Sequence, residues 1–389
     1  MQYKLLGELV NRKIGYGIVQ PGQSVPNGVP VIKVNNLIAG LNSPLELDTT
    51  THENDSKYSR TRLHGGELII SVVGTIGKTA IVPKSFDGCN LVRATALIDI
   101  DNELIAKWVK YYIDSSAGQS YIEQNLNTTV QPTLNIKSLV QMPIPFFDES
   151  IMKGTVSLLS SLDDKIRVNN KINDNLLGQM QALYRSWFVD FLPFGGSKPR
   201  TWTETDIYSL ANIIYGAPFK SKQFNTDGVG TPIIRIRDLK DQQFATYTTE
   251  IHPKGYLLQP GDIVVGMDGE FRPYIWGNDG AWLNQRVCVF ENKRPNGKAF
   301  LYFTIKPLLY GIEQTQVATT VIHIGKKDFD AFEITLPDAS TLDDFDALTT
   351  PMMRVIVSNC FENKRLAALR DILLPKLMSG EIDVSDIQL

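Results

Sequence analysis

Apolar residues recur every three or four positions through one long stretch near the middle of the chain. The series consists of Leu159, Leu162, Ile166, Leu176, Met180, Leu183 and Trp187. This spacing is the seam of a coiled-coil helix and predicts a helix over residues 150–190. Asn169 and Asn173 occupy the two seam positions that the series leaves out. Buried asparagines would fix the register of paired helices, because an amide finds its partner in only one alignment. The alternative is that both face solvent and interrupt the seam.

The pattern of apolar and polar positions occurs twice along the chain, in the same order. "PVIKVNNL" from Pro30 matches "PIIRIRDL" from Pro232, and "GGELIISVVG" from Gly65 matches "PGDIVVGMDG" from Pro260. Near the end of each half, "NKINDNLL" from Asn170 stands opposite "NKRLAALR" from Asn363. Ordered self-similarity of this kind predicts a duplication, with insertions confined to loops.

Each repeat is predicted to contain a β-rich domain followed by a long helix. Strands are expected at "ELIISVV", "TAIVP", "DIVVGM", "RVCVFE" and "TVIHI", and an amphipathic helix at "ELIAKWVKYYIDSS". The predicted boundaries are residues 1–149 and 200–341 for the domains, 150–190 and 342–389 for the helices, and 191–199 for a linker. The glycines and prolines of the linker cannot continue a helix, and Pro375 should kink or end the last one.

Two similar helices that follow two similar domains can pair antiparallel about a pseudo-twofold axis. The alternative is that each helix packs on its own domain. We therefore predict an α+β fold, in which two β-rich domains are related by pseudo-twofold symmetry and separated by two long antiparallel coiled-coil helices.

Composition narrows the class of protein. The chain has 389 residues, of which 43% are hydrophobic, so it can bury more than one core. Three widely spaced cysteines suggest a reducing compartment, and the four histidines lack metal-ligand spacing. The formal charge of −3 does not suggest a general polyanion binder, so a nucleic-acid surface would need its basic residues on one face. No apolar run reaches membrane-spanning length and the first residues do not resemble a signal peptide, so we expect a cytoplasmic protein without a membrane partner.

One motif resembles a phosphate-binding loop but fails on inspection. "VVGTIGKTAIV" has Val72 where the first glycine of such a loop must stand, and a strand rather than a helix is expected after Thr79. Gly74 and Gly77 are therefore expected in a hairpin turn, which either is purely structural or presents Thr75 and Lys78 to a ligand.

Catalytic constellations are not evident in the sequence. The pairs Asp163–Asp164 and Asp343–Asp344 are interpreted as helix-start carboxylates, and neither a nucleophile elbow nor an adenine-methyltransferase motif is found. We predict a chain without catalytic residues, metal or cofactor of its own.

Two segments carry a family resemblance. "LLSSLDDKIRVNNKINDNLLGQMQALYRSWFVDFLPF" closely resembles the central conserved region of specificity subunits of type I restriction-modification systems, and "LRDILLPKLMSGEI" is similar to their distal conserved region. The resemblance runs the length of the chain. It implies a non-catalytic subunit in which two target-recognition domains read an asymmetric, two-part site in double-stranded DNA. It also implies two modification subunits that use S-adenosylmethionine, and restriction subunits that use ATP and Mg²⁺.

Loop residues able to read base edges are the candidate DNA contacts, since Arg and Lys recognise guanine and Asn and Gln recognise adenine. They are Arg60, Arg62, Lys78, Arg93, Thr129 and Gln131 in the first half, and Arg237, Arg272, Gln285, Arg286, Gln316 and Thr319 in the second. The candidate spacer and subunit-docking residues are Leu162, Ile166, Asn169, Asn173, Leu176, Leu183, Trp187, Leu366, Leu369 and Leu373. The alternatives are a coiled-coil scaffold without DNA specificity and a nucleotide-binding enzyme that uses Lys78.

Overall fold

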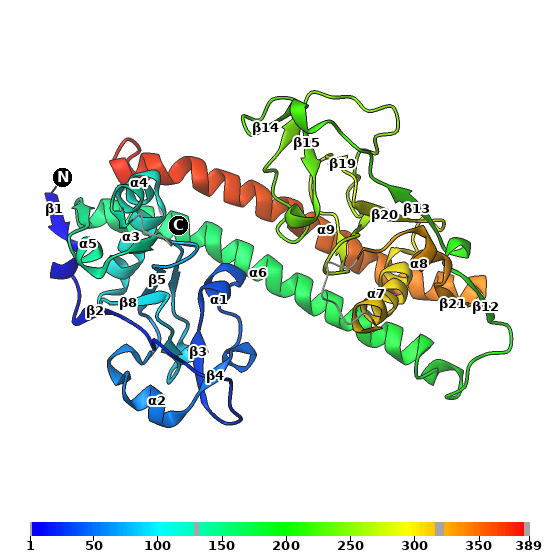
Figure 1. The fold of residues 1–389 in the computed structure, drawn as a ribbon, viewed down its shortest axis with the longest axis horizontal. Coiled ribbons are helices and arrows are strands. Elements are labelled where there is room, and N and C mark those ends of the chain that lie inside the picture. Colours follow the sequence, from blue (N-terminus) through cyan, green and yellow to red (C-terminus); the bar gives the residue numbers. More distant parts are fainter. Residues whose placement is uncertain (1, 128–131, 316–322, 385–389) are drawn as a thin grey trace. The chain divides into compact units, whose positions relative to one another are not determined.

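The structure is a computed structural model that describes residues 2–127, 132–315 and 323–384 (Figure 1). The chain forms two compact units: unit 1 comprises Met1–Asp163 and Ala367–Leu389, and unit 2 comprises Asp164–Leu366. Two long helices, α6 (Glu149–Phe188) and α9 (Ala339–Ser379), each contribute one part to each unit. Each long helix is therefore divided between the two units, whereas the predicted boundaries had separated the helices from both domains.

Unit 1 is built on a four-stranded antiparallel sheet in the order β2-β8-β5-β6. Its strands are β2 (Arg12–Tyr16), β5 (Leu68–Ser71), β6 (Thr79–Ile81) and β8 (Thr95–Asp99). Leu68 and Ile70 point into a core beneath helix α3 (Glu103–Asp114), whereas Ile69 between them joins the core on the opposite face. Because alternate residues of a strand face opposite sides, the apolar run in β5 marks a strand covered on both faces.

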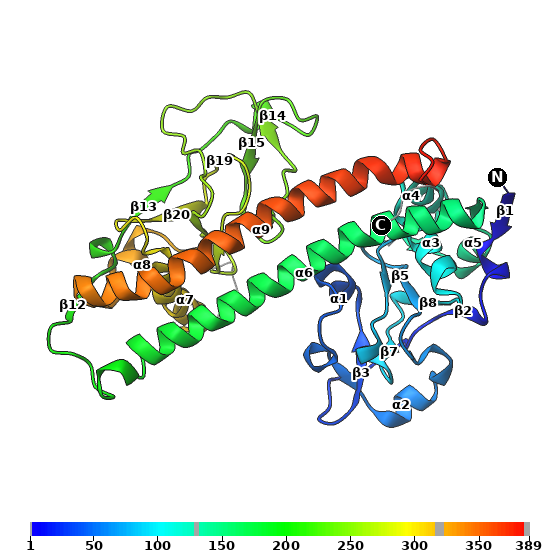
Figure 2. The ribbon, with the colours of Figure 1, turned by 180° about the vertical axis from the view of Figure 1, so that it is seen from behind.

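A second, smaller sheet covers the face away from α3 (Figure 2). It has the order β4-β3-β7, with β3 and β7 parallel. Its strands are β3 (Val29–Ile32), β4 (Thr49–Thr50) and β7 (Asn90–Leu91). The remaining elements of unit 1 are β1 (Gln2–Leu5), β9 (Leu126–Asn127), β10 (Thr133–Leu134), β11 (Pro143–Phe146), α1 (Val34–Ala39), α2 (His52–Ser56), α4 (Ser116–Gln124) and α5 (Ile136–Val140).

Unit 2 repeats this plan, with one additional strand, β14, in its second sheet. Its main sheet has the order β13-β20-β17-β18, and its second sheet, β14-β16-β15-β19, again contains a parallel pair. Its strands are β12 (Thr203–Asp206), β13 (Ala211–Tyr215), β14 (Phe224–Asn225), β15 (Thr231–Ile234), β16 (Tyr247–Thr248), β17 (Ile263–Gly266), β18 (Pro273–Ile275), β19 (Trp282–Leu283), β20 (Val287–Asn292) and β21 (Glu333–Leu336). Its shorter helices are α7 (Lys298–Thr315) and α8 (Lys326–Asp330). The predicted duplication and the α+β class are confirmed.

Both long helices supply core residues to each unit. In unit 1, Leu159 of α6 and Leu377 of α9 are fully buried in the same core. In unit 2, Met180 of α6 and Phe345 of α9 share the other. The two expectations for the helices thus both hold in part: each helix packs on the domain that precedes it, and each also pairs with the other helix.

Two local predictions need correction, and a third is not tested. Pro375 does not end the last helix, which continues to Ser379 and stops before Gly380 at a φ of 77°. Asp163 lies in the interior of α6 and not at a helix start, so its carboxylate is available for a side-chain partner. Most of the predicted strand "TVIHI" lies outside the described residues, and His323 forms only an isolated bridge with Asp268.

The predicted break after α6 is present. The helix ends at Phe188, and the following segment contains Phe191, Gly195 and Gly196 at positive φ. Glycine adopts this conformation without the steric cost that a side chain would add, so the Gly pair suits the exit from the helix.

Candidate nucleic-acid interface

In unit 1, several loops meet around a hollow of about 600 Å³, which we call corner 1. Its lining includes Lys33 and Asn35 at the start of α1, Val73 after β5, Arg93 between β7 and β8, and Thr133 of β10. The backbone fixes these loops: the Arg93 N–H donates to the Ile18 carbonyl at 2.8 Å, and Val73 and Thr133 form a bridge. Corner 1 thus gathers basic and amide side chains on loops held by main-chain hydrogen bonds.

Unit 2 builds the equivalent corner 2 with corresponding hydrogen bonds of the main chain. The Gln285 N–H donates to the Ala217 carbonyl at 2.9 Å, just as Arg93 donates to Ile18. The Asp238 carboxylate accepts the N–H of Arg235 at 3.1 Å, as the Asn36 amide accepts that of Lys33 at 2.7 Å. Gln285 therefore stands where unit 1 has Arg93, and Arg237 stands where unit 1 has Asn35.

The chemistry of corner 2 differs from that of corner 1. The bridge between Asp268 and His323 replaces the one between Val73 and Thr133. The Nδ1 atom of His323 lies 2.6 Å from the Asp268 carboxylate, and the guanidinium of Arg286 lies 3.6 Å from it. Apolar Val73 of unit 1 thus corresponds to acidic Asp268 of unit 2. The Asp268 carboxylate contacts two basic side chains.

The predicted DNA contacts separate into three groups. Arg60, Lys78, Arg93 and Gln285 are exposed, and among the described residues their side chains form no ion pair. Ion pairs engage the side chains of Arg62 with Asp55, Arg237 with Asp238, Arg272 with Glu313, and Arg286 with Asp268. Thr129, Gln131, Gln316 and Thr319 lie outside the described residues.

Two of these arginines are held too firmly to be simple surface cations. Arg62 pairs with Asp55, whose side chain is only 2% exposed. Arg272 lies 2.5 Å from the Glu313 carboxylate and 5.7 Å from the centre of the Tyr310 ring. The hydrogen bond that Arg272 donates to the Glu313 carboxylate raises the pKa of Arg272 despite partial burial. Both arginines are thus engaged in contacts within their own unit.

The loop from Val73 to Lys78 is a hairpin turn and not a phosphate-binding loop. Gly74 and Gly77 have φ values of 79° and 83°, and β6 follows, pairing antiparallel with β5. The helix N-terminus that a phosphate-binding loop requires does not follow this turn. The predicted hairpin is confirmed, and the nucleotide-binding alternative loses its structural basis.

The two asparagines of the seam are buried in unit 2 and do not face solvent. Asn169 is fully buried and donates its amide to Asn363 Oδ1 at 2.9 Å, while Asn359 donates to Asn173 Oδ1 at 2.8 Å. The helix segments therefore run antiparallel here. We did not predict Asn359 and Asn363 as seam residues, although their four-residue spacing on α9 repeats that of Asn169 and Asn173 on α6. The match between Asn170 and Asn363 obscured that repeat.

The other predicted helix residues differ in burial. Leu162 is buried, and Leu369 is 46% exposed. Those of intermediate burial are Ile166, Leu176, Leu183, Trp187, Leu366 and Leu373. On α9 of unit 1, burial falls mainly on Leu374 and Leu377, one and four residues beyond the predicted Leu373.

Membrane-spanning helices and metal sites were both sought in the described part of the chain. No helix there is long and apolar enough to cross a membrane. Likewise, within residues 2–127, 132–315 and 323–384 no cluster of three His, Cys, Asp or Glu side chains could hold a metal ion.

The family described as type I restriction modification DNA specificity domain matches this chain twice, over residues 2–177 and 199–354. The chain belongs to this family. Each match contains one of the two corners, so the specificity domain occurs here in two copies with different loop side chains.

Named relatives agree with this assignment. The EcoBI specificity subunit of Escherichia coli is 37% identical over 138 residues, which cover 35% of this chain but only 29% of that relative. The MjaIX specificity subunit of Methanocaldococcus jannaschii is 21% identical over 305 residues, covering 73% of this chain and 71% of the relative. The crystal structure of a type I S subunit from M. genitalium shares the fold, with a TM-score of 0.53 and 14% identity over 97% of this chain and 95% of the other.

Proposed function

We propose that this chain is the DNA-recognition subunit of a type I restriction-modification complex and reads a two-part, asymmetric site in double-stranded DNA. The observation that carries the proposal is that the specificity domain occurs twice, with one corner in each copy built on the same backbone but lined by different side chains. An arginine in one corner suits guanine, and a glutamine at the equivalent place suits adenine. Two unlike half-sites follow from two unlike corners.

The chain contributes recognition and no chemical step in this proposal. The α6 and α9 helices dock two modification subunits, which bind S-adenosylmethionine and methylate adenine. Restriction subunits, which use ATP and Mg²⁺, join the same complex. Exposed apolar side chains on the long helices support a docking role, among them Val168, Ile172, Leu369 and Ile372.

Methylation mapping in a host that expresses this chain with its modification subunit tests the proposal. Methylated adenines are expected within a motif of two different parts separated by unread base pairs. A host with the modification subunit alone is the control and should lack that motif. Methylation without any sequence motif, or the same motif without this chain, would contradict the proposal and favour a scaffold without DNA specificity.

A further inference from the structure

The hairpin turn between β5 and β6 is fastened from within by a buried serine. Ser71 is fully buried, its Oγ accepts the N–H of Lys78 at 2.8 Å, and its hydroxyl donates to the Thr75 carbonyl at 2.6 Å. Thr75 and Lys78 themselves are exposed. The turn begins directly after Val73, which lines corner 1, so its exposed side chains stand at the rim of that corner.

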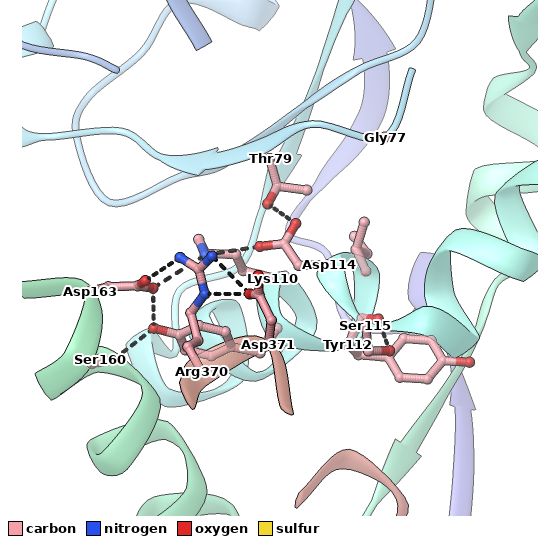
Figure 3. A network of polar contacts seen from close by, with 12 residues as sticks. Gly77, Thr79, Lys110, Tyr112, Asp114, Ser115, Ser160, Asp163, Arg370 and Asp371 are labelled. Atoms are coloured by element: carbon pink, nitrogen blue, oxygen red, sulfur yellow. Dashed lines mark hydrogen bonds and ion pairs between the residues drawn. The ribbon is translucent and has the colours of Figure 1, made fainter. Parts of the chain in front are cut away.

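The same turn is also held from outside by helices α3 and α4. Figure 3 shows the contact of Thr79 with Asp114 of α3. The side-chain amide of Gln119 donates to the Gly77 carbonyl at 3.2 Å, and the Thr79 hydroxyl donates to Asp114 Oδ1 at 2.6 Å. A Cβ at Gly77 would lie 2.8 Å from the Gln119 side chain. Both ends of the segment Gly77–Thr79 are therefore tied to the helices, with Lys78 between the two contacts.

Asp114 is in turn fixed by a network that includes both long helices within unit 1. Lys110 donates to Asp114 Oδ2 at 2.9 Å and lies 3.8 Å from Asp163 of α6. Asp163 accepts the Tyr111 hydroxyl and an Arg370 N–H of α9, each at 2.8 Å. A carboxylate constrained by several partners is a better anchor than a lone surface side chain, because less conformational freedom remains in it.

Unit 2 anchors its corresponding turn with different residues. Glu313 of α7 accepts the Phe271 N–H at 2.6 Å and pairs with Arg272 at 2.5 Å. The Glu313 side chain is 15% exposed, while Gly269 and Glu270 at the turn are exposed. Two units with unrelated turn sequences thus share one device, an acidic side chain on the following helix that holds the turn.

We propose that Asp114 and Glu313 are positioning residues for DNA recognition, each holding the turn of its own unit so that the exposed residues of the turn meet the duplex. The proposal rests on the proposed function. It assigns Arg272, which is engaged by Glu313, to the anchor. Base or phosphate contact is left to Lys78 in unit 1, and contact with a base amino group to the exposed Glu270 in unit 2. A rigid turn meets the DNA without an ordering cost, so loss of the anchor weakens discrimination between bases.

Selection from a randomised double-stranded DNA library, using the full chain with its modification subunits, tests this role. Asp114→Ala should reduce base preference about three- to tenfold in one part of the selected motif, and Glu313→Ala should do so in the other part. Glu313→Gln keeps an acceptor for the Phe271 N–H and should retain most of the preference. Glu123→Ala is the matched control, since Glu123 is exposed on α4 and its side chain has no hydrogen bond or ion pair among the described residues.

Thermal unfolding of each variant separates positioning from folding. If Asp114→Ala does not fold, Thr79→Val removes the same anchoring hydrogen bond at nearly constant volume and takes its place. Preference that falls equally in both parts of the motif, or in neither part for folded variants, would overturn the proposal. A wild-type complex that selects no motif would instead refute the proposed function, and this proposal with it.

Discussion

Corner 1 and corner 2 have the same backbone and different side chains. The paired loops are held by the same main-chain hydrogen bonds, from Arg93 to Ile18 in one unit and from Gln285 to Ala217 in the other. Main-chain groups do not depend on residue type, so substitutions at these loop positions leave the shape of the corner unchanged. Shape and recognition are therefore separate in this fold. Main-chain hydrogen bonds fix the position of each loop residue, and its side chain determines what it can contact.

The pairing of α6 with α9 shows a second contrast between the units. In unit 1 the helices are joined by the half-buried ion pair between Asp163 and Arg370. In unit 2 the buried contacts are amide hydrogen bonds, and the ion pair between Lys165 and Glu362 is more exposed. Burial alone would lower the pKa of Arg370, but the hydrogen bonds and charges of Asp163 and Asp371 outweigh it and raise that pKa. The more buried contact between the helices is thus an ion pair in unit 1 and a set of amide hydrogen bonds in unit 2.

The largest expected effect concerns the part of α9 that completes unit 1. Leu377→Ala should lower the free energy of unfolding of unit 1 by about 2–5 kcal/mol, because Leu377 is fully buried in that core. Leu369→Ala is the matched control and should change it by less than about 0.5 kcal/mol, since this leucine is 46% exposed. Thermal unfolding monitored by calorimetry would measure both. A loss in Leu377→Ala as small as that in Leu369→Ala would show that unit 1 does not depend on this segment.

The next effect tests the ion pair of unit 1. A double-mutant cycle with Asp163→Asn and Arg370→Met should give a coupling energy of about 1–2 kcal/mol, between the values for exposed and buried pairs. The reason is intermediate burial, with side chains 28% and 31% exposed. The coupling should fall in 1 M salt because counter-ions screen partly exposed charges. A coupling that is insensitive to salt would mean that packing, not charge, joins these residues.

The amide contact of unit 2 should behave differently. Asn173→Leu alone leaves the Asn359 amide without its acceptor and should cost about 1 kcal/mol, whereas Asn173→Leu combined with Asn359→Leu should recover most of that loss. Neither effect should depend on salt. Denaturant unfolding at low and high salt would measure this cycle beside that of unit 1. A double variant less stable than the single one would contradict the assigned contact.

The smallest effect lies at the start of α9. Asp338 accepts the Thr341 N–H at 3.0 Å and the hydroxyls of Ser340 and Thr341, and these bonds hold its pKa well below the usual range. Asp338→Ala should cost about 0.5–1 kcal/mol at pH 7. Since the pKa is lowered in the folded state, this contribution is complete above pH 4 or so and disappears as the pH falls towards the folded pKa.

Asp148 provides the matched control for that helix start. It immediately precedes α6, is exposed, and its side chain forms no hydrogen bond among the described residues. Asp148→Ala should therefore change stability less than Asp338→Ala, at neutral pH and at pH 3 alike. A pH-independent loss in Asp338→Ala would contradict the capping role.

The sequence predicted the elements and their repetition well, because periodicity and ordered matches survive in a single chain. The run "ELIISVV" was expected to be a strand and is one, and the helix expected at 150–190 spans Glu149–Phe188. The seam position of Asn169 also predicted its burial. These features depend on local spacing alone.

Side-chain partners could not be predicted in the same way. Asp163 was interpreted as a helix-start carboxylate, whereas its partner Arg370 is 207 residues away in sequence. Arg272 was selected as a base-reading residue, but Glu313, 41 residues later, engages it. Contacts between distant segments decide which basic loop residues remain without an ion pair. The residue type at one position carries no information about those contacts.

The central claim is that each corner reads its own half of the target, and the DNA motif selected by three forms of the full complex tests it most directly. The wild type should select a motif of two unlike parts. Arg93→Ala should relax one part, by about 1–3 kcal/mol at the affected base pair, and Gln285→Ala should relax only the other part. If both variants relax the same part, or if both lower affinity evenly without changing the motif, the claim that the two corners read separate half-sites is wrong.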